Sequence, residues 1–264
     1  MSWLGPALDD EQRDLAAMLD AFAADRDVLL SDDADVVIGL ATELAELGIW
    51  TVGTDERHGG GGADPVTTAV AMQRLGRAWP ALGWAATQAH AAVDVLGGDH
   101  RFADLVDAVH SAAAAVAVVD ATSRQARLLW SGETLDGSVD RIDPAAEAPY
   151  LLLLGAHRAV LVRPEVTSSR PLERTGLAGA LTRSVRFTGS VPAGTVHRLD
   201  GVDVDAARIR LRRGAAAVAA GIAAAAADAA AAYAAQRHQF GGPSPPCRPS
   251  ASRCRTRPPG PRWR

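Results

Sequence analysis

The sequence predicts an α+β fold in which an all-helical region is followed by a small β domain and then by one long helix. Three observations predict this order. Apolar residues recur at helical spacing through the first hundred residues, and short apolar or alternating runs take over from about Ala113. No proline interrupts the alanine-rich stretch from Asp203 to Phe240. We therefore divide the chain into an N-terminal helical domain, a middle β domain, a helix and a tail, over residues 1–112, 113–202, 203–241 and 242–264.

The N-terminal region carries start and stop signals for five helices. Asp9, with Gln12 three positions on, is expected to cap the first helix, and Gly48 is expected to end the second. Asp64 followed by Pro65 is the signal for the start of the third. The fourth and fifth helices are expected over Pro80–Leu96 and Asp99–Val109.

Two features of this region invite a chemical interpretation, and a structural one is preferred for both. The glycine run Gly59–Gly62 lacks the preceding strand and the Gly-Lys-Ser/Thr ending of a phosphate-binding loop, so we interpret it as a flexible turn. His90 lies alone among alanines on the fourth helix, and we expect a core or surface residue rather than a catalyst.

The middle region contains the short runs that are typical of strands in a small sheet or barrel. Gly, Pro, Asp and Ser separate these runs and favour turns between them. The expected strands are Val116–Val119, Arg127–Trp130, Tyr150–Leu154, Ala159–Val162 and Ser184–Phe187.

The third region is predicted to be one long helix, because sixteen of the twenty-one residues Ala215–Ala235 are alanine. Its small side chains suit the close approach of neighbouring helices in a bundle. A membrane span is the alternative, but Asp228 would lie inside it, and Leu, Ile and Phe are nearly absent. We therefore expect a bundle helix and no membrane partner.

The composition is that of a soluble globular protein, with 48% hydrophobic and 22% charged residues. The net charge is −4, and because six of the 27 basic residues lie in the tail, the body is acidic and gives no reason to expect nucleic acid. Both cysteines, Cys247 and Cys254, lie in the tail, and no metal site is expected. The N-terminus lacks the pattern of a signal peptide, so the expected location is the cytoplasm.

The tail at residues 242–264 is rich in Arg and Pro and lacks apolar periodicity, so disorder is expected. One hypothesis is that it is an out-of-frame translation of a GC-rich gene, since helical pattern stops abruptly and cysteine first appears there. The alternative is an arm that binds RNA or acidic partners.

The long helix is followed by a recognisable motif, Tyr233-Ala-Ala-Gln-Arg237-His-Gln239-Phe240-Gly241. An alanine-rich helix with this ending resembles the first helix of the C-terminal bundle in the acyl-CoA dehydrogenase family. The resemblance implies that Arg237, Gln239 and Phe240 reach the FAD of a neighbouring subunit, with Arg237 at the pyrophosphate. A guanidinium suits this role because it forms charge-assisted hydrogen bonds to phosphate oxygens. The alternative is that Arg237 is a solvated cation at the helix end.

The resemblance covers about residues 8–241, and it implies the order of helical domain, β-barrel-like domain and C-terminal bundle. It also implies FAD-dependent α,β-dehydrogenation of an acyl-CoA thioester, by a homo- or hetero-oligomer formed through the C-terminal helix. The family's Thr-Glu-Pro and Gly-Ser-Asp pattern for flavin binding is replaced here by Asp120-Ala-Thr122-Ser123. Thr122 and Ser123 are candidate hydrogen-bond donors to the flavin, with ordinary turn chemistry as the alternative.

No catalytic residue is assigned from the sequence. The family's base is a Glu late in the bundle or, in a minority, near the start of its first helix, and Ala206–Arg213 contains no carboxylate. Asp203 and Asp205 are interpreted as an N-cap and a first-turn acid. Two alternatives to an active enzyme therefore stay open, a non-catalytic partner subunit of a heteromeric acyl-CoA dehydrogenase and an inactive truncated relic.

Overall fold

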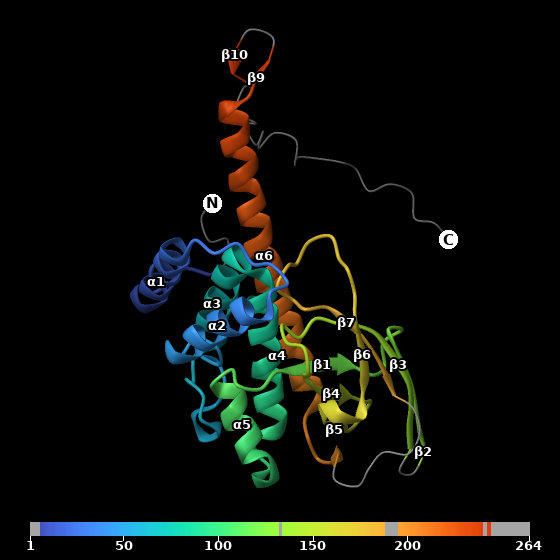
Figure 1. Cartoon of the computed structure of the whole chain (residues 1–264). Helices are drawn as coiled ribbons and strands as arrows, with labels where there is room; N and C mark the ends of the chain where they lie inside the picture. Colours follow the sequence, from blue (N-terminus) through green and yellow to red (C-terminus); the bar gives the residue numbers. More distant parts are fainter. Residues whose placement is uncertain (1–5, 132–133, 188–194, 240–241, 244–264) are drawn as a thin grey trace, which may run out of the picture.

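The computed structural model describes residues 6–131, 134–187, 195–239 and 242–243. Helices α1 to α5 form one side of the molecule, and two sheets form the other (Figure 1). Helix α6 runs along both parts and then projects beyond them (Figure 1). The α+β order predicted from the sequence is confirmed.

The first and third helices begin at their predicted capping residues, whereas the expected fifth helix, Asp99–Val109, begins only at Ala103 because His100–Phe102 form a 3₁₀ turn. The Asp9 side chain accepts a hydrogen bond from the Gln12 N–H at 2.8 Å, and the Gln12 side chain accepts one from the Asp9 N–H. Gly48 follows the second helix with φ of 71°, a value that suits glycine. The helices are α1 Asp10–Arg26, α2 Ala34–Glu46, α3 Pro65–Ala78, α4 Pro80–Leu96 and α5 Ala103–His110, with short 3₁₀ turns at Glu56–His58 and His100–Phe102.

The glycine run forms a compact turn that is closed by backbone hydrogen bonds. The Gly62 N–H donates to the Thr54 carbonyl at 2.8 Å, and the Ala63 N–H donates to the Val52 carbonyl at 2.9 Å. A Cβ at Gly60 would lie 2.4 Å from the Thr54 carbonyl oxygen, so this backbone approaches its own chain rather than a phosphate. The prediction of a turn is confirmed.

The β region consists of two four-stranded sheets. The first has the order β1-β4-β5-β8, from Val116–Asp120, Tyr150–Leu154, Ala159–Val162 and Val196–Leu199, with β1 parallel to β4 and the other pairs antiparallel. The second is antiparallel with the order β2-β3-β7-β6, from Ala126–Ser131, Thr134–Ile142, Arg183–Phe187 and Ser168–Pro171, and a 3₁₀ turn Pro164–Val166 precedes β6. The five predicted strands are present, and β3, β6 and β8 were not predicted.

The first sheet is buried on both faces, which explains its continuous apolar runs. In β4, Leu152 and Leu154 pack against the helices, whereas Leu151 and Leu153 face the second sheet. The same alternation holds in β1, where Val118 packs toward the helices. The middle sheet layer therefore joins two cores, one shared with the helices and one between the sheets.

Helix α6 spans Val204–Gln236, and the Asp203 side chain caps it by accepting the Ala206 N–H at 2.8 Å. Where α6 crosses α3 at Gly221, the two backbones lie too close together for a side chain. A Cβ at Gly221 would lie 2.2 Å from the Gln73 carbonyl oxygen. The sequence prediction of a helix through Phe240 is wrong at its end. Arg237 is extended, and β9 His238–Gln239 pairs with β10 Gly242–Pro243.

Among the described residues, α6 is one helix that is long and apolar enough to cross a membrane by length and composition. Its first half instead contacts α3 and α4 in the protein core. The predicted disordered tail lies outside the described residues from position 244 onward.

Candidate functional site

The largest of the described cavities, about 460 Å³, lies where α4, the end of β1 and α6 meet, and we call it the junction cavity. Its walls are mainly apolar, and most of its polar side chains come from the β region. The apolar lining includes Trp84, Val118, Val119, Ile142, Leu177, Leu211, Val218 and Ile222. The polar lining is Gln88, Asp120, Ser123, Gln125, Arg141, Asp143 and Arg174. An apolar cavity with a few convergent polar groups has the character of a ligand site.

Gln88 holds the helical side of the junction cavity to the sheets. Its side chain is 2% exposed, and its Oε1 accepts the Val118 N–H of the edge strand β1 at 3.0 Å. Its Nε2 donates to the Asp143 carbonyl at 2.8 Å. One side chain thus fixes α4 against β1 and against the loop after β3.

Asp143 lies in that loop, and one oxygen of its carboxylate, Oδ1, accepts two side-chain hydrogen bonds. It accepts hydrogen bonds from Arg174 at 2.5 Å and from the Thr182 hydroxyl at 2.6 Å. Arg141 adds a longer ion pair at 3.5 Å. This carboxylate holds two arginines at the cavity wall.

Asp120, the second carboxylate of the junction cavity, is also paired. It accepts the Thr122 hydroxyl at 2.7 Å and lies 3.3 Å from Arg208 of α6. Burial would raise the pKa of Asp120, but the hydrogen bonds from Thr122 and the Arg208 charge outweigh burial and lower that pKa. Arg208 also donates to the Gly155 carbonyl at 2.5 Å, which ties α6 to β4.

The two predicted flavin donors after β1 have different positions. Ser123 lines the junction cavity. The Thr122 hydroxyl donates a hydrogen bond to the Asp120 carboxylate, and Thr122 is not among the described lining residues of the junction cavity. The Ser123 N–H donates to the Asp120 carbonyl at 3.0 Å, so this segment forms the turn that was the alternative prediction.

The predicted residues at the end of α6 lie far from the junction cavity within this chain. Ile222 lines the cavity, and Arg237 follows fifteen residues later, which is about 22 Å along a helix. The Arg237 guanidinium carbon lies 5.6 Å from the centre of the Tyr233 ring. Gln239 belongs to β9, and Phe240 lies outside the described residues. The structure therefore does not bring Arg237 and Ser123 together in one chain.

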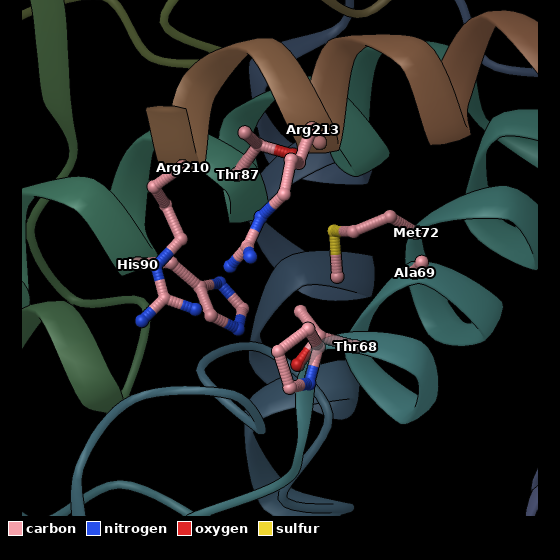
Figure 2. Close-up of a pocket in the computed structure, with 9 residues that line it drawn as sticks. Thr68, Ala69, Met72, Thr87, His90, Arg210 and Arg213 are labelled. Carbon is pink, nitrogen blue, oxygen red and sulfur yellow. The ribbon is translucent and has the colours of Figure 1, made fainter. Parts of the chain in front are cut away.

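A second, small cavity of about 20 Å³ lies beside His90 and Arg210, and Figure 2 shows both side chains with Arg213 from α6. His90 is 1% exposed, accepts the Gly53 N–H at its Nε2, and has its Nδ1 2.7 Å from the Ala86 carbonyl. Burial lowers the pKa of His90 to about 4, so the ring is neutral near pH 7. The space holds about one water molecule. Of the two positions expected for His90, core or surface, the structure shows the core.

Arg210 joins the same network from α6. It makes two hydrogen bonds to Asp94, at 2.6 and 3.1 Å, and one to the Gly53 carbonyl at 2.9 Å. This arrangement fastens α6 to α4 and to the segment before the glycine turn. It is structural because all of its polar groups are paired within the protein.

Sequence reasoning missed Gln88, Asp143 and Arg208. A glutamine in an alanine-rich helix was a usable signal for Gln88, since a buried amide needs partners. The other two carried no local signal. Among the described residues, no group of three or more His, Cys, Asp and Glu side chains is arranged to hold a metal ion.

The comparisons with known proteins concern both the sequence and the fold. The acyl-CoA dehydrogenase N-terminal domain family matches residues 9–97. The prolyl acyl carrier protein oxidase AnaB is 17% identical with a TM-score of 0.70, over 90% of this chain and 72% of AnaB. Butyryl-CoA dehydrogenase from Megasphaera elsdenii is 20% identical with a TM-score of 0.68, over 92% of this chain and 73% of that one.

A glutaryl-CoA dehydrogenase from Mycobacterium smegmatis, in complex with FADH2, is 17% identical with a TM-score of 0.67. This match covers 89% of the present chain and 68% of that one. No curated protein sequence matches the chain. The chain therefore has the fold of the acyl-CoA dehydrogenase structures, and its residues 9–97 match the N-terminal domain of that family.

Proposed function

We propose that this chain is a flavin-binding subunit of an oxidoreductase of the acyl-CoA dehydrogenase type, and that the junction cavity holds the flavin ring and the acyl group beside it. The observation that carries the proposal is the position of the cavity, where the helical domain, the β region and α6 meet. A ligand at this junction contacts all three parts of the fold at once.

The side chains of the junction cavity suit a planar ring with a polar edge. Trp84 and Leu211 offer apolar surface, while Ser123, Gln125 and Arg141 offer hydrogen-bond donors. The solved structures of PigA and of the glutaryl-CoA dehydrogenase contain FAD and FADH2, respectively, and this supports FAD as the cofactor here.

We propose that Arg237, Gln239 and Phe240 act on the flavin of a second chain. The end of α6 projects beyond the helices and sheets of its own chain (Figure 1), and this supports a contact between Arg237 and another molecule. Arg237 would bind the FAD pyrophosphate through charge-assisted hydrogen bonds. This role makes the flavin site a shared one and requires at least a dimer.

The proposed substrate is an acyl thioester, carried either by coenzyme A or by an acyl carrier protein. Butyryl-CoA dehydrogenase and the prolyl acyl carrier protein oxidase share this fold and are named for these two carriers. In α,β-dehydrogenation a base takes the proton from carbon 2, and the bound flavin supplies the acceptor for the hydride from carbon 3.

A second candidate function is that of a non-catalytic subunit that completes the flavin site of a partner. The observation that favours it is that both carboxylates described in the junction cavity, Asp120 and Asp143, are bound to arginines. A carboxylate held by a guanidinium is a weak base, and the pKa of Asp120 is lowered. This candidate predicts flavin binding without reduction by substrate.

A matched pair of α6 substitutions tests flavin binding. Ala219 and Ala220 are both exposed, but of the two only Ala219 is among the described lining residues of the junction cavity. Ala219→Trp fills the cavity and is expected to weaken FAD binding at least tenfold, while Ala220→Trp leaves it unchanged. Titration of FAD by flavin fluorescence gives the two dissociation constants, and equal weakening in both variants, or no binding to the parent protein, refutes the proposal.

Anaerobic mixing of the FAD-loaded protein with butyryl-CoA distinguishes the two candidate functions. Bleaching of the visible flavin absorbance shows that the chain catalyses hydride transfer from the substrate to the flavin. Bound flavin that stays oxidised identifies the non-catalytic subunit instead. Colourless aggregate with either ligand leaves the inactive relic as the remaining explanation.

A further inference from the structure

A third cavity, of about 180 Å³, opens between the two sheets on the other side of the β1 end, and we call it the inter-sheet cavity. Its walls come from both sheets and are apolar, with Leu128 and Leu135 on the second sheet and Leu153 and Val160 on the first. Its polar lining is two arginines, Arg158 and Arg198. The junction cavity and this one are separate, since their described lining residues do not overlap.

The strand register explains why a cation borders this apolar space. Arg198 on β8 is directly opposite Val160 on β5, and Val160 is opposite Leu153 on β4. Residues opposite each other in antiparallel strands share one face of the sheet. Since Leu153 and Val160 belong to the core between the sheets, Arg198 is on the inner face, at an edge strand.

Neither arginine of the inter-sheet cavity is paired with a carboxylate in the described part of the chain. Arg158 lies in the turn between β4 and β5, and the side chains of both arginines are exposed at the mouth. Asp120 precedes the lining residue Ala121, but Thr122 and Arg208 already occupy its carboxylate. The cavity therefore combines an apolar interior with two available positive charges at its opening.

We propose that the inter-sheet cavity binds the anion of a short- or medium-chain carboxylic acid, with its chain between the sheets and its carboxylate at Arg198 and Arg158. The volume has room for roughly ten water-sized groups, which suits a chain of several carbons. Arginine binds carboxylates through paired, charge-assisted hydrogen bonds. This site is independent of flavin binding at the junction cavity.

The structural alternative is that Arg198 protects the edge of the first sheet. Inward-pointing charges on edge strands prevent sheets from pairing edge to edge. This alternative predicts no ligand, and it predicts that removing the charge increases self-association. The two explanations therefore differ in measurable ways.

Octanoate is the probe, and its dissociation constant is measured by isothermal titration calorimetry on the full chain. We expect octanoate to bind and Arg198→Gln to weaken its binding about tenfold, as the loss of a charge-assisted hydrogen bond predicts. Arg198→Lys keeps the charge but loses the paired donors, so it is expected to bind octanoate more tightly than Arg198→Gln and more weakly than the parent protein. The matched control is Arg127→Gln, because Arg127 is an exposed arginine of β2 that is paired with Asp140.

Chain recognition is tested separately with Val160→Phe, which fills the inter-sheet cavity and is expected to abolish octanoate binding. A cooperative thermal unfolding transition establishes that Val160→Phe is folded. If Val160→Phe does not fold, the variants of the exposed residue Arg198 still test the proposal. Octylamine carries the same chain with a cationic head and is expected not to bind. The proposal is overturned if octanoate does not bind, if octanol binds equally well, or if Arg198→Gln has no effect.

Discussion

Replacing Gln88 by methionine tests whether one buried amide holds the helical domain to the sheets. The substitution keeps the length of the side chain but leaves the Val118 N–H and the Asp143 carbonyl without their partner. Leaving the buried Val118 N–H without a hydrogen-bond partner costs about 1–3 kcal/mol of stability. Leaving the half-buried Asp143 carbonyl without its partner costs about 0.5–1.5 kcal/mol more. We therefore expect Gln88→Met to lower the free energy of unfolding by about 2–4 kcal/mol and Tm by roughly 5–10 °C.

Urea denaturation followed by tryptophan fluorescence measures this loss. The control is Gln125→Met, since Gln125 also lines the junction cavity but has an exposed side chain. It is expected to change the free energy of unfolding by less than about 0.5 kcal/mol. A loss below about 1 kcal/mol for Gln88→Met, or equal losses in both variants, refutes the idea that these two hydrogen bonds secure the junction.

Two further predictions concern helix packing and pH. Gly221→Ala places a Cβ 2.2 Å from the Gln73 carbonyl oxygen and is expected to cost at least about 2 kcal/mol in urea denaturation. Gly39→Ala, on the exposed face of α2 with nothing nearby, is expected to stabilise by about 0.5–1 kcal/mol, and a loss there contradicts the packing argument. Burial lowers the pKa of His90 to about 4 in the folded state, so between about pH 6.5 and 4 the unfolded state binds a proton more readily. The free energy of unfolding is therefore expected to fall as pH falls through this window, by up to about 3 kcal/mol. His90→Gln is expected to flatten this pH dependence, and exposed His157→Gln is expected to keep it; an unchanged slope in His90→Gln contradicts the assignment.

The sequence predicted those parts of the fold whose signals are local. The capping pair Asp9 and Gln12 and the Asp64-Pro65 start lie within one helical turn, so their geometry follows from a few adjacent residues. Strands β3 and β6 were missed because Gly137 and polar residues interrupt β3, and all four residues of β6 are exposed. Such strands exist through pairing with neighbours rather than through their own composition.

The candidate site was predicted less completely, for the same physical reason. Ser123 was named through the family resemblance, because it stands where the family has its flavin-binding pattern, and it lines the junction cavity. Gln88 and Val118 are 30 residues apart, and Gln88 and Asp143 are 55 apart. Neither contact can therefore be predicted from a short stretch of sequence. The end of α6 at Gln236 was placed too late because the motif after it carries good helix formers.

The exposed second half of α6 has a consequence for the denatured state. From Ala229 to Gln236 the helix is largely exposed, so its helical form depends on alanine propensity and hydrogen bonds within the helix. Alanine-rich segments longer than about 15 residues retain partial helicity in water without any tertiary contact. Far-ultraviolet circular dichroism is therefore expected to report residual helix after the tertiary structure is lost, and the signals of backbone and tryptophan will not coincide on unfolding.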